Sequence, residues 1–117
     1  MEDISNKLTE FSQIEQAINT NHKIEITYAL DDYSYETIIN PYKIVNFEGF
    51  WYLIAKRKGN LRRYYLQNIF DVEILEDKFR KSKNIEKLIS NAINIWFDET
   101  DSFEVELLIE SSIKKYL

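Results

Sequence analysis

Residues 50–69, FWYLIAKRKGNLRRYYLQNI, decide the fold because they spell out a complete β-hairpin. Apolar and aromatic residues fill both halves, and Gly59-Asn60 between them suits a two-residue hairpin loop. With that loop, the period-two alternation of a strand places Leu53, Ala55 and Tyr64 on a core face. The opposite face carries Tyr52, Ile54, Tyr65 and Gln67 and leads to Lys56 and Arg63.

The same hairpin holds an unusual concentration of positive charge. The chain has 15 basic and 20 acidic residues, but residues 50–69 contain five cations and no acid, namely Lys56, Arg57, Lys58, Arg62 and Arg63. The predicted turn sets Arg57 opposite Arg62 and Lys56 opposite Arg63. Like charges in that position destabilise a sheet by up to about 1 kcal/mol per pair. We therefore expect an anion between them, either an external phosphate or a carboxylate of the chain from Asp31, Asp32 or the Glu-rich strand within residues 101–117.

Aromatic residues flank these cations. Tyr52, Tyr64, Tyr65 and Phe70 stand on either side of them in the sequence. Exposed aromatics beside Arg and Lys on a small β-fold are typical of surfaces for single-stranded nucleic acid, where stacking contributes roughly 1–3 kcal/mol per base. The alternative is that the tyrosines line a core with their hydroxyls outward. We favour the core for Tyr64 and the ligand for Tyr52.

The rest of the first 77 residues reads as one helix followed by strands. Apolar residues recur every three or four positions in residues 8–21, which predicts an amphipathic helix. Alternating patterns then predict strands at residues 22–29, 34–49, 50–58, 61–69 and 69–75. Pro41 cannot donate to a ladder, so the second strand is bent or at an edge there. Five strands with short links predict a mainly β fold, a small barrel after one helix.

The C-terminal part has a different pattern. Residues 78–97 start basic and become helical, and residues 101–117 read as an alternating strand followed by the start of a helix. A lone strand and a helical stub cannot bury their own faces. We therefore predict a barrel domain at 1–77, a linker helix at 78–100, and at 101–117 the beginning of a small α/β extension domain.

Composition argues against an enzyme. The chain has no cysteine, one histidine and two glycines. A Cys-His pair, a histidine metal cluster and a glycine-rich phosphate loop are therefore not expected, and no cofactor is predicted. The N-terminus does not resemble a signal peptide, and no apolar run approaches the ~20 residues of a membrane helix. We expect a cytoplasmic protein with no membrane partner.

The motifs PYKIVNFEGFWYLIA and LRRYYLQNI resemble the WYL-domain family of bacterial regulators, named for the tripeptide Trp51-Tyr52-Leu53. The preceding pieces AINTN, IEITYA and INPYKIV match the same family in order, over about residues 12–75. The resemblance implies an Sm-like, SH3-type five-stranded barrel that commonly follows a winged helix-turn-helix. It also implies regulation of transcription in response to a nucleotide-like or nucleic-acid ligand. Binding to DNA would then use a region outside this sequence.

The resemblance carries over to individual residues. Tyr52 matches the family tyrosine and Arg62 the first family arginine, whereas Tyr65 and Asn68 stand where the family often has further arginines. This departure implies weaker phosphate binding or a different ligand, unless neighbouring cations compensate. The candidate ligand-binding or nucleic-acid-binding residues are Tyr52, Lys56, Arg57, Arg62, Arg63, Tyr65 and Asn68.

Two functions follow from these observations. The first is a ligand-sensing regulatory domain that binds a nucleotide or short single strand. The alternative is a protein–protein interaction or dimerisation module, in which the basic hairpin docks on an acidic surface of a second protomer. The two can coexist, since regulators of this kind are usually homodimers.

Overall fold

The computed structural model describes residues 2–97. The chain forms two compact units, Met1–Lys81 and Ser82–Leu117. Each unit is described by itself. The strand and helix predicted at 101–117 lie outside the described residues.

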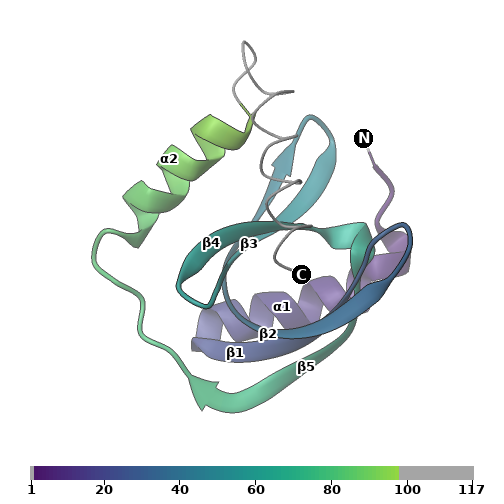
Figure 1. Ribbon diagram of the computed structural model, residues 1–117, viewed down its shortest axis with the longest axis horizontal. Helices are drawn as coiled ribbons and strands as arrows, with labels where there is room; N and C mark the ends of the chain where they lie inside the picture. The colour runs from purple at the N-terminus through teal and green to yellow at the C-terminus, as the bar shows by residue number, and fades with distance from the viewer. Residues whose placement is uncertain (1, 98–117) are drawn as a thin grey trace. The chain divides into compact units, whose positions relative to one another are not determined.

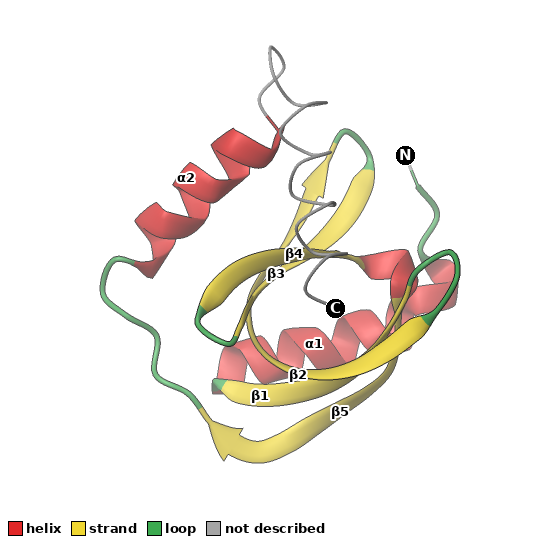
Figure 2. Cartoon of the chain, in the orientation of Figure 1, coloured by secondary structure: helices red, strands yellow, loops and turns green. Residues whose placement is uncertain are grey.

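The first unit is a curved antiparallel sheet with one helix (Figures 1 and 2). A short 3-10 helix η1 (Ser5–Lys7) leads into α1 (Leu8–Thr20). The strands are β1 (His22–Ala29), β2 (Ser34–Phe47), β3 (Phe50–Arg57), β4 (Asn60–Tyr65) and β5 (Ile69–Lys78), with η2 (Leu66–Asn68) before β5. The mainly β, five-stranded fold predicted from the sequence is confirmed.

The sheet has the order β4-β3-β2-β1-β5 and does not close. Among the described strands, β4 pairs with β3 only and β5 pairs with β1 only, so the predicted barrel is a curled open sheet. The predicted strand at 61–69 is also shorter than expected, because η2 interrupts it after Tyr65. That turn of 3-10 helix redirects the chain, so that β4 and β5 lie at opposite ends of the strand order.

One face of α1 closes one side of the core. Ile14 and Ala17 are fully buried, and the edge of the Phe11 ring packs on Trp51 at a centroid distance of 5.6 Å. The helix ends where Asn21 adopts the left-handed conformation, with a φ of 58°. Asn is one of the few residues that tolerate this conformation. The C-terminus of the helix therefore lies where the sequence predicted it.

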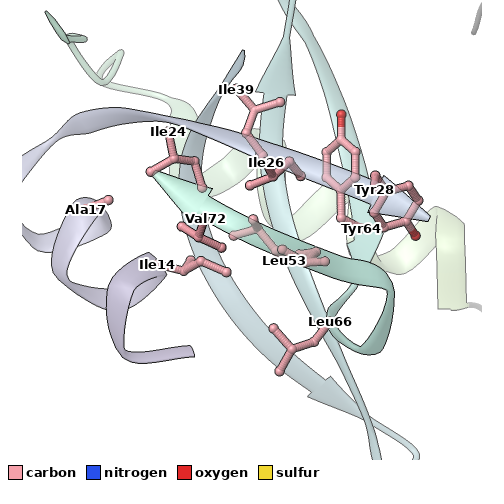
Figure 3. Packing of buried hydrophobic residues seen from close by; sticks show 12 residues of the cluster. Ile14, Ala17, Ile24, Ile26, Tyr28, Ile39, Leu53, Tyr64, Leu66 and Val72 are labelled. Atoms are coloured by element: carbon pink, nitrogen blue, oxygen red, sulfur yellow. The ribbon is translucent and has the colours of Figure 1, made fainter. Parts of the chain in front are cut away.

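The hydrophobic core follows the alternation of the strands (Figure 3). Ile24 and Ile26 of β1 are fully buried, and they face Leu53 and Tyr64 of the hairpin within one cluster. Burying such an aliphatic side chain contributes about 1.5–3 kcal/mol. The core face predicted for Leu53, Ala55 and Tyr64 is therefore confirmed.

The turn of the β3–β4 hairpin is Lys58-Gly59, which corrects the prediction of Gly59-Asn60. φ is 51° at Lys58 and 83° at Gly59, as a two-residue loop with two left-handed positions requires. Glu48-Gly49 forms the β2–β3 turn in the same way, with φ values of 52° and 88°. Both loops thus put glycine at the second position, where its lack of a Cβ removes the steric cost.

This turn changes every cross-strand pair of the hairpin. Arg57 pairs with Asn60, Lys56 with Leu61, Ala55 with Arg62 and Ile54 with Arg63. The predicted pairs of like charge therefore do not form, and the inference of an anion between them was wrong. Repulsion between two such pairs, up to about 1 kcal/mol each, favours the observed register over the predicted one. Each partner moves by two positions, so every side chain keeps its predicted face.

A bulge in β2 sets the faces of the neighbouring strand. Pro41 pairs with Ala55, but Lys43 pairs with Ile54, so Tyr42 is the extra residue. Proline in a sheet is expected at such irregular positions. Because paired residues share a face, the bulge moves Lys43 to the face that carries Ile54.

A buried lysine ties the start of α1 to β5. The Lys7 side chain is 3% exposed, and its Nζ donates a hydrogen bond of 2.7 Å to the carbonyl oxygen of Ile69. The same Nζ lies 3.4 Å from the centroid of the Phe70 ring and 3.9 Å from a carboxylate oxygen of Glu10. The ammonium group is thus compensated by three different partners, which a buried charge requires.

The described part of the second unit is α2 (Ile85–Phe97). The sequence predicted a basic segment from residue 78 that becomes helical, and the helix begins at Ile85. Ile85, Ile89, Trp96 and Phe97 are buried, in agreement with the predicted apolar stripe, whereas Leu88 and Ile95 are exposed.

The turn assignment predicts the effect of one substitution. Lys58→Asn creates an Asn-Gly loop, and Asn tolerates the left-handed conformation better than Lys. We expect the free energy of unfolding, measured by urea denaturation, to rise by about 0.5–1 kcal/mol. The matched change Lys56→Asn, in a strand position, should lower it. A loss of stability in Lys58→Asn would instead support the Gly59-Asn60 turn.

The buried ammonium group predicts a second effect. Lys7→Met keeps the apolar stem but leaves the Ile69 carbonyl without its donor, so we expect a loss of about 1–3 kcal/mol in the free energy of unfolding. Lys78→Met, at an exposed position, should change it by less than about 0.5 kcal/mol. Equal values for the two variants would show that the Lys7 contacts contribute nothing.

Candidate ligand-binding surface

The predicted site residues separate onto two faces of the hairpin. Tyr52, Lys56, Arg63 and Tyr65 lie on the face that we call the outer face, which also carries Ile54. Arg57 and Arg62 lie on the inner face, with Leu53, Ala55 and Tyr64. Successive side chains of a strand point to opposite faces, so one ligand cannot lie flat on both groups.

Asn68 lies apart from both groups. It is half-buried in η2, at the end of β4 remote from the hairpin turn. Its neighbour Gln67 bonds to Asn6 and to the backbone of Asp3, which fixes η2 against the N-terminal segment. The structure does not bring Asn68 together with the cations of the hairpin tip.

The outer face is built around an aromatic pair. Tyr52 and Tyr65 are direct cross-strand partners, and their ring centroids are 5.7 Å apart at an interplanar angle of 48°. Phe50 continues the row, with its centroid 6.2 Å from that of Tyr65, and it is 48% exposed. Cross-strand aromatic pairs stabilise a sheet, and a half-exposed ring also leaves an apolar surface for stacking.

Cations flank this aromatic row. The Arg63 guanidinium lies 5.7 Å from the centroid of the Tyr52 ring, and the residue is 4% exposed. The Lys56 Nζ lies 6.0 Å from the centroid of the Tyr42 ring. Both distances are within the range of cation–π contacts, which hold the charges beside the rings.

Two residues of this surface were not predicted from the sequence. Lys43 shares the face of Ile54, and Tyr42 lies next to Lys56, because of the bulge after Pro41. Without the bulge, Lys43 would pair with an inner-face residue. Pro41 signals an irregularity but not its position, so alternation alone assigns these side chains incorrectly.

An acidic residue occupies the Tyr65 end of the outer face. The Tyr65 hydroxyl donates a hydrogen bond to the Glu2 carboxylate, whose other oxygen accepts one of 3.4 Å from the Trp51 amide. The Glu2 amide in turn donates to the Gly49 carbonyl oxygen, at 3.0 Å. Burial, followed by this bond to Glu2, raises the pKa of Tyr65 to about 12.

The inner-face arginines lie near a tyrosine cluster. Arg57 Nε donates a hydrogen bond of 3.0 Å to the Thr37 hydroxyl, and its guanidinium lies 5.7 Å from the centroid of the Tyr35 ring. Burial raises the pKa of Tyr35 to about 12, although the charges of Arg57 and Arg62 act in the opposite direction. Burial also raises the pKa of Tyr64, whose ring is in the core as predicted.

In the part of the chain that the structure describes, four of the hairpin cations have no carboxylate partner. Within residues 2–97, no carboxylate lies within ion-pair distance of Lys56, Arg57, Lys58 or Arg62. The glutamates at 101–117, also considered as internal partners, lie outside the described residues. Asp31 and Asp32, proposed above as internal partners, are exposed and make no such pair. Among residues 2–97, Glu2 is an acid that contacts the predicted site, where it accepts hydrogen bonds from the Tyr65 hydroxyl and the Trp51 amide.

The described part of the chain contains no group of three or more His, Asp or Glu side chains suited to holding a metal ion. None of its helices is long and apolar enough to cross a membrane.

The raised pKa of Tyr65 predicts an alkaline loss of stability. Tyrosine in the unfolded chain ionises near pH 10, whereas folded Tyr65 holds its proton to about pH 12. The stabilisation is complete below pH 10 and is lost as the pH rises toward 12. We expect the free energy of unfolding, measured by urea denaturation at pH 8–11, to fall less steeply with pH in Tyr65→Phe and in Glu2→Gln than in the unaltered chain. An unchanged decline in both variants would contradict the Tyr65–Glu2 contact.

Comparison with known proteins places this fold and motif in a family. A model of the WYL domain matches residues 9–74. The structure is similar to proteasome accessory factor B/C (PafBC) of Arthrobacter aurescens, with a TM-score of 0.63 and 19% identity. That likeness covers 74% of this chain but 14% of the other, and at this identity it shows a shared fold alone. A comparison with curated proteins finds no match. The family match spans most of the first unit and more than half of the sequence, and the chain therefore belongs to the WYL domain family.

Proposed function

We propose that this chain is the ligand-sensing regulatory domain of a transcriptional regulator, and that it binds a nucleotide or a short single-stranded nucleic acid on the outer face. Membership of the WYL family supports the regulatory role. The observation that carries the ligand class is the row of Phe50, Tyr65 and Tyr52, with the Arg63 guanidinium beside it.

The aromatic row supplies stacking surface for bases. Phe50 is half-exposed and next to Tyr65, so a base can pack on the end of the row without moving the core. Each base stacked on an aromatic side chain contributes about 1–3 kcal/mol. Such binding is tolerant of sequence, since every base has a flat face.

The cations of the outer face would bind the phosphate groups of the ligand. Lys43 and Lys56 lie on the outer face with Arg63, and each charge neutralised by a phosphate releases counterions. The Arg63 guanidinium nitrogens are buried, so this charge lies beneath the surface beside Tyr52, whereas the two lysines are more accessible and can contact a phosphate.

Glu2 makes the two ends of the outer face chemically different, because it places a carboxylate at the Tyr65 end. A carboxylate beside Tyr65 repels phosphate but accepts hydrogen bonds from sugar hydroxyls or exocyclic amines. We therefore orient the ligand with its base or sugar near Tyr65 and its phosphate near Lys43 and Lys56. This orientation explains why a residue with a negative charge is compatible with an anionic ligand.

Further parts of the proposal follow from the regulatory role. A regulator of bacterial transcription acts in the cytoplasm and commonly as a homodimer, and contact with operator DNA would use a region outside this sequence. We assign this chain no catalytic step and no cofactor. Its task is to change the state of a larger protein when the outer face is occupied.

A fluorescently labelled single-stranded oligonucleotide tests the proposal. We expect binding at low salt, with an affinity that falls as salt rises because phosphates are neutralised. Lys56→Gln should reduce the slope of log K against log salt by about 1. Tyr52→Leu should weaken binding by about tenfold or more through lost stacking.

The exposed lysine of β5 provides the control. Lys78→Gln removes the same charge far from the aromatic row in the strand order, so it should leave affinity and slope unchanged. Equal effects of Lys56→Gln and Lys78→Gln on affinity and salt slope would show that the oligonucleotide binds by nonspecific charge attraction. Absence of binding at low salt, to the oligonucleotide and to ATP alike, would contradict the proposal.

A further inference from the structure

Half of β2 has an edge without a neighbouring strand in the part of the chain that the structure describes. Residues 34–39 pair with β1 on one side, whereas pairing with β3 starts only at Asn40. β3 ends at Arg57, so the hairpin stops where this free edge of β2 begins. The free edge, residues 34–39, therefore offers backbone donors and acceptors to a further strand.

The sequence of the free edge has little of the usual protection. It reads SYETII, which is rich in β-branched and aromatic residues, carries the single charge of Glu36 and contains neither lysine nor proline. The outer strands of the sheet are protected by charge, since β4 carries two arginines and β5 carries acids along its length. Natural proteins place charges or proline on edges that must not pair. The free edge of β2 has the composition of a strand that does pair.

A pocket lies directly at this edge. It has a volume of about 440 Å³ and is lined by Glu25, Glu36, Thr37, Ile38, Arg57 and Lys58. The residues come from β1, from the free edge and from the hairpin tip. The pocket is thus the space into which a strand added to β2 would extend.

One side of the free edge is cationic. Thr37 and Tyr35 lie on the inner face, where the Thr37 hydroxyl and the Tyr35 ring hold the Arg57 side chain. Arg62 is close enough to influence the pKa of Tyr35. The terminal nitrogens of Arg57 make no hydrogen bond to any residue that the structure describes, so they are available to a carboxylate.

The other side of the free edge is acidic and apolar. Glu36 and Ile38 alternate with the residues above and point to the opposite face, where Glu25 is the cross-strand partner of Ile38. Ile38 is 51% exposed, and Glu36 is exposed as well. A side chain entering here meets the Ile38 side chain beside the carboxylates of Glu25 and Glu36.

We propose that residues 34–39 of β2 bind an extended peptide segment as a sixth strand, and that the segment carries an acidic residue at every second position. Successive side chains of a strand point to opposite faces. The acidic side chains of the added strand therefore point to the inner face, where they meet Arg57 and Arg62. The alternate side chains, which are apolar or basic, point to the opposite face, where they meet Ile38 and the carboxylates of Glu25 and Glu36. Main-chain pairing supplies affinity and the alternating charge supplies specificity. This site lies at the free edge of β2 and does not use the aromatic row of the outer face.

A pair of peptides of equal composition tests the proposal on the full chain. The probe is acetyl-Glu-Val-Glu-Lys-Glu-Val-amide, and the control is acetyl-Glu-Glu-Glu-Lys-Val-Val-amide, with the same net charge and no alternation. We expect the probe to shift the backbone amide resonances of residues 34–39 in a ¹⁵N-labelled protein, and the control to bind about tenfold more weakly. Equal binding of the two peptides would overturn the proposal.

Methylated peptides test the main-chain pairing without changing the protein. A strand directs the amides of alternate residues to the same edge, so N-methylation of one alternate set should abolish binding and that of the other set should be tolerated. Equal tolerance of both sets would exclude strand addition. Resonance shifts at Tyr52 and Tyr65, without any at residues 34–39, would place the peptide on the outer face and also overturn the proposal.

Charge variants test the predicted direction of the side chains. Arg57→Glu and Arg62→Glu should each weaken binding of the probe by about tenfold, whereas Lys78→Glu, which makes the same charge change on β5, should not. Glu36→Lys should weaken the probe, with its central lysine, and should favour a peptide in which that lysine is replaced by glutamate. No difference between Arg57→Glu and Lys78→Glu would contradict the assignment.

Discussion

The register of the β3–β4 hairpin is the constraint on which the candidate sites depend. Lys58 and Gly59 both adopt left-handed backbone conformations, and the loop they form fixes which residues stand opposite each other. Because this loop differs from Gly59-Asn60 by one position, no two cations of the hairpin are direct cross-strand partners. Positive charge is thus spread over both faces at the tip, and the core pair of Leu53 and Tyr64 is retained.

Strand alternation then turns one cluster in the sequence into two surfaces in space. Arg63 and Lys56 join the tyrosines of the outer face, where the bulge at Pro41 adds Lys43. Arg57 and Arg62 belong to the inner face and lie beside the free edge of β2. A flat aromatic surface with cations suits stacked bases and phosphates, whereas an open strand edge suits a peptide backbone. The two proposed ligands would therefore use different cations of the same hairpin.

Contacts with the N-terminal segment connect these surfaces to the rest of the unit. Glu2 binds Tyr65 and Trp51, and Lys7 binds the backbone of β5 next to Phe70. Both residues precede α1 in the sequence, and nothing in local periodicity indicates where their side chains lie. Each places a charge where the sheet needs a hydrogen-bond partner, and each makes the hairpin or β5 sensitive to the position of the first residues of the chain.

The sequence by itself determined the elements that depend on local periodicity. The helix at Leu8–Thr20, the strand at His22–Ala29, the inward direction of Leu53 and the outward direction of Tyr52 all follow from alternation or from a 3.6-residue repeat. The family resemblance also rests on local motifs. Only the tertiary structure decided the turn at Lys58, the bulge after Pro41, the open sheet and the position of Glu2. These features depend on competition between registers that differ by about 1 kcal/mol and on contacts between residues far apart in the chain, neither of which a local pattern records.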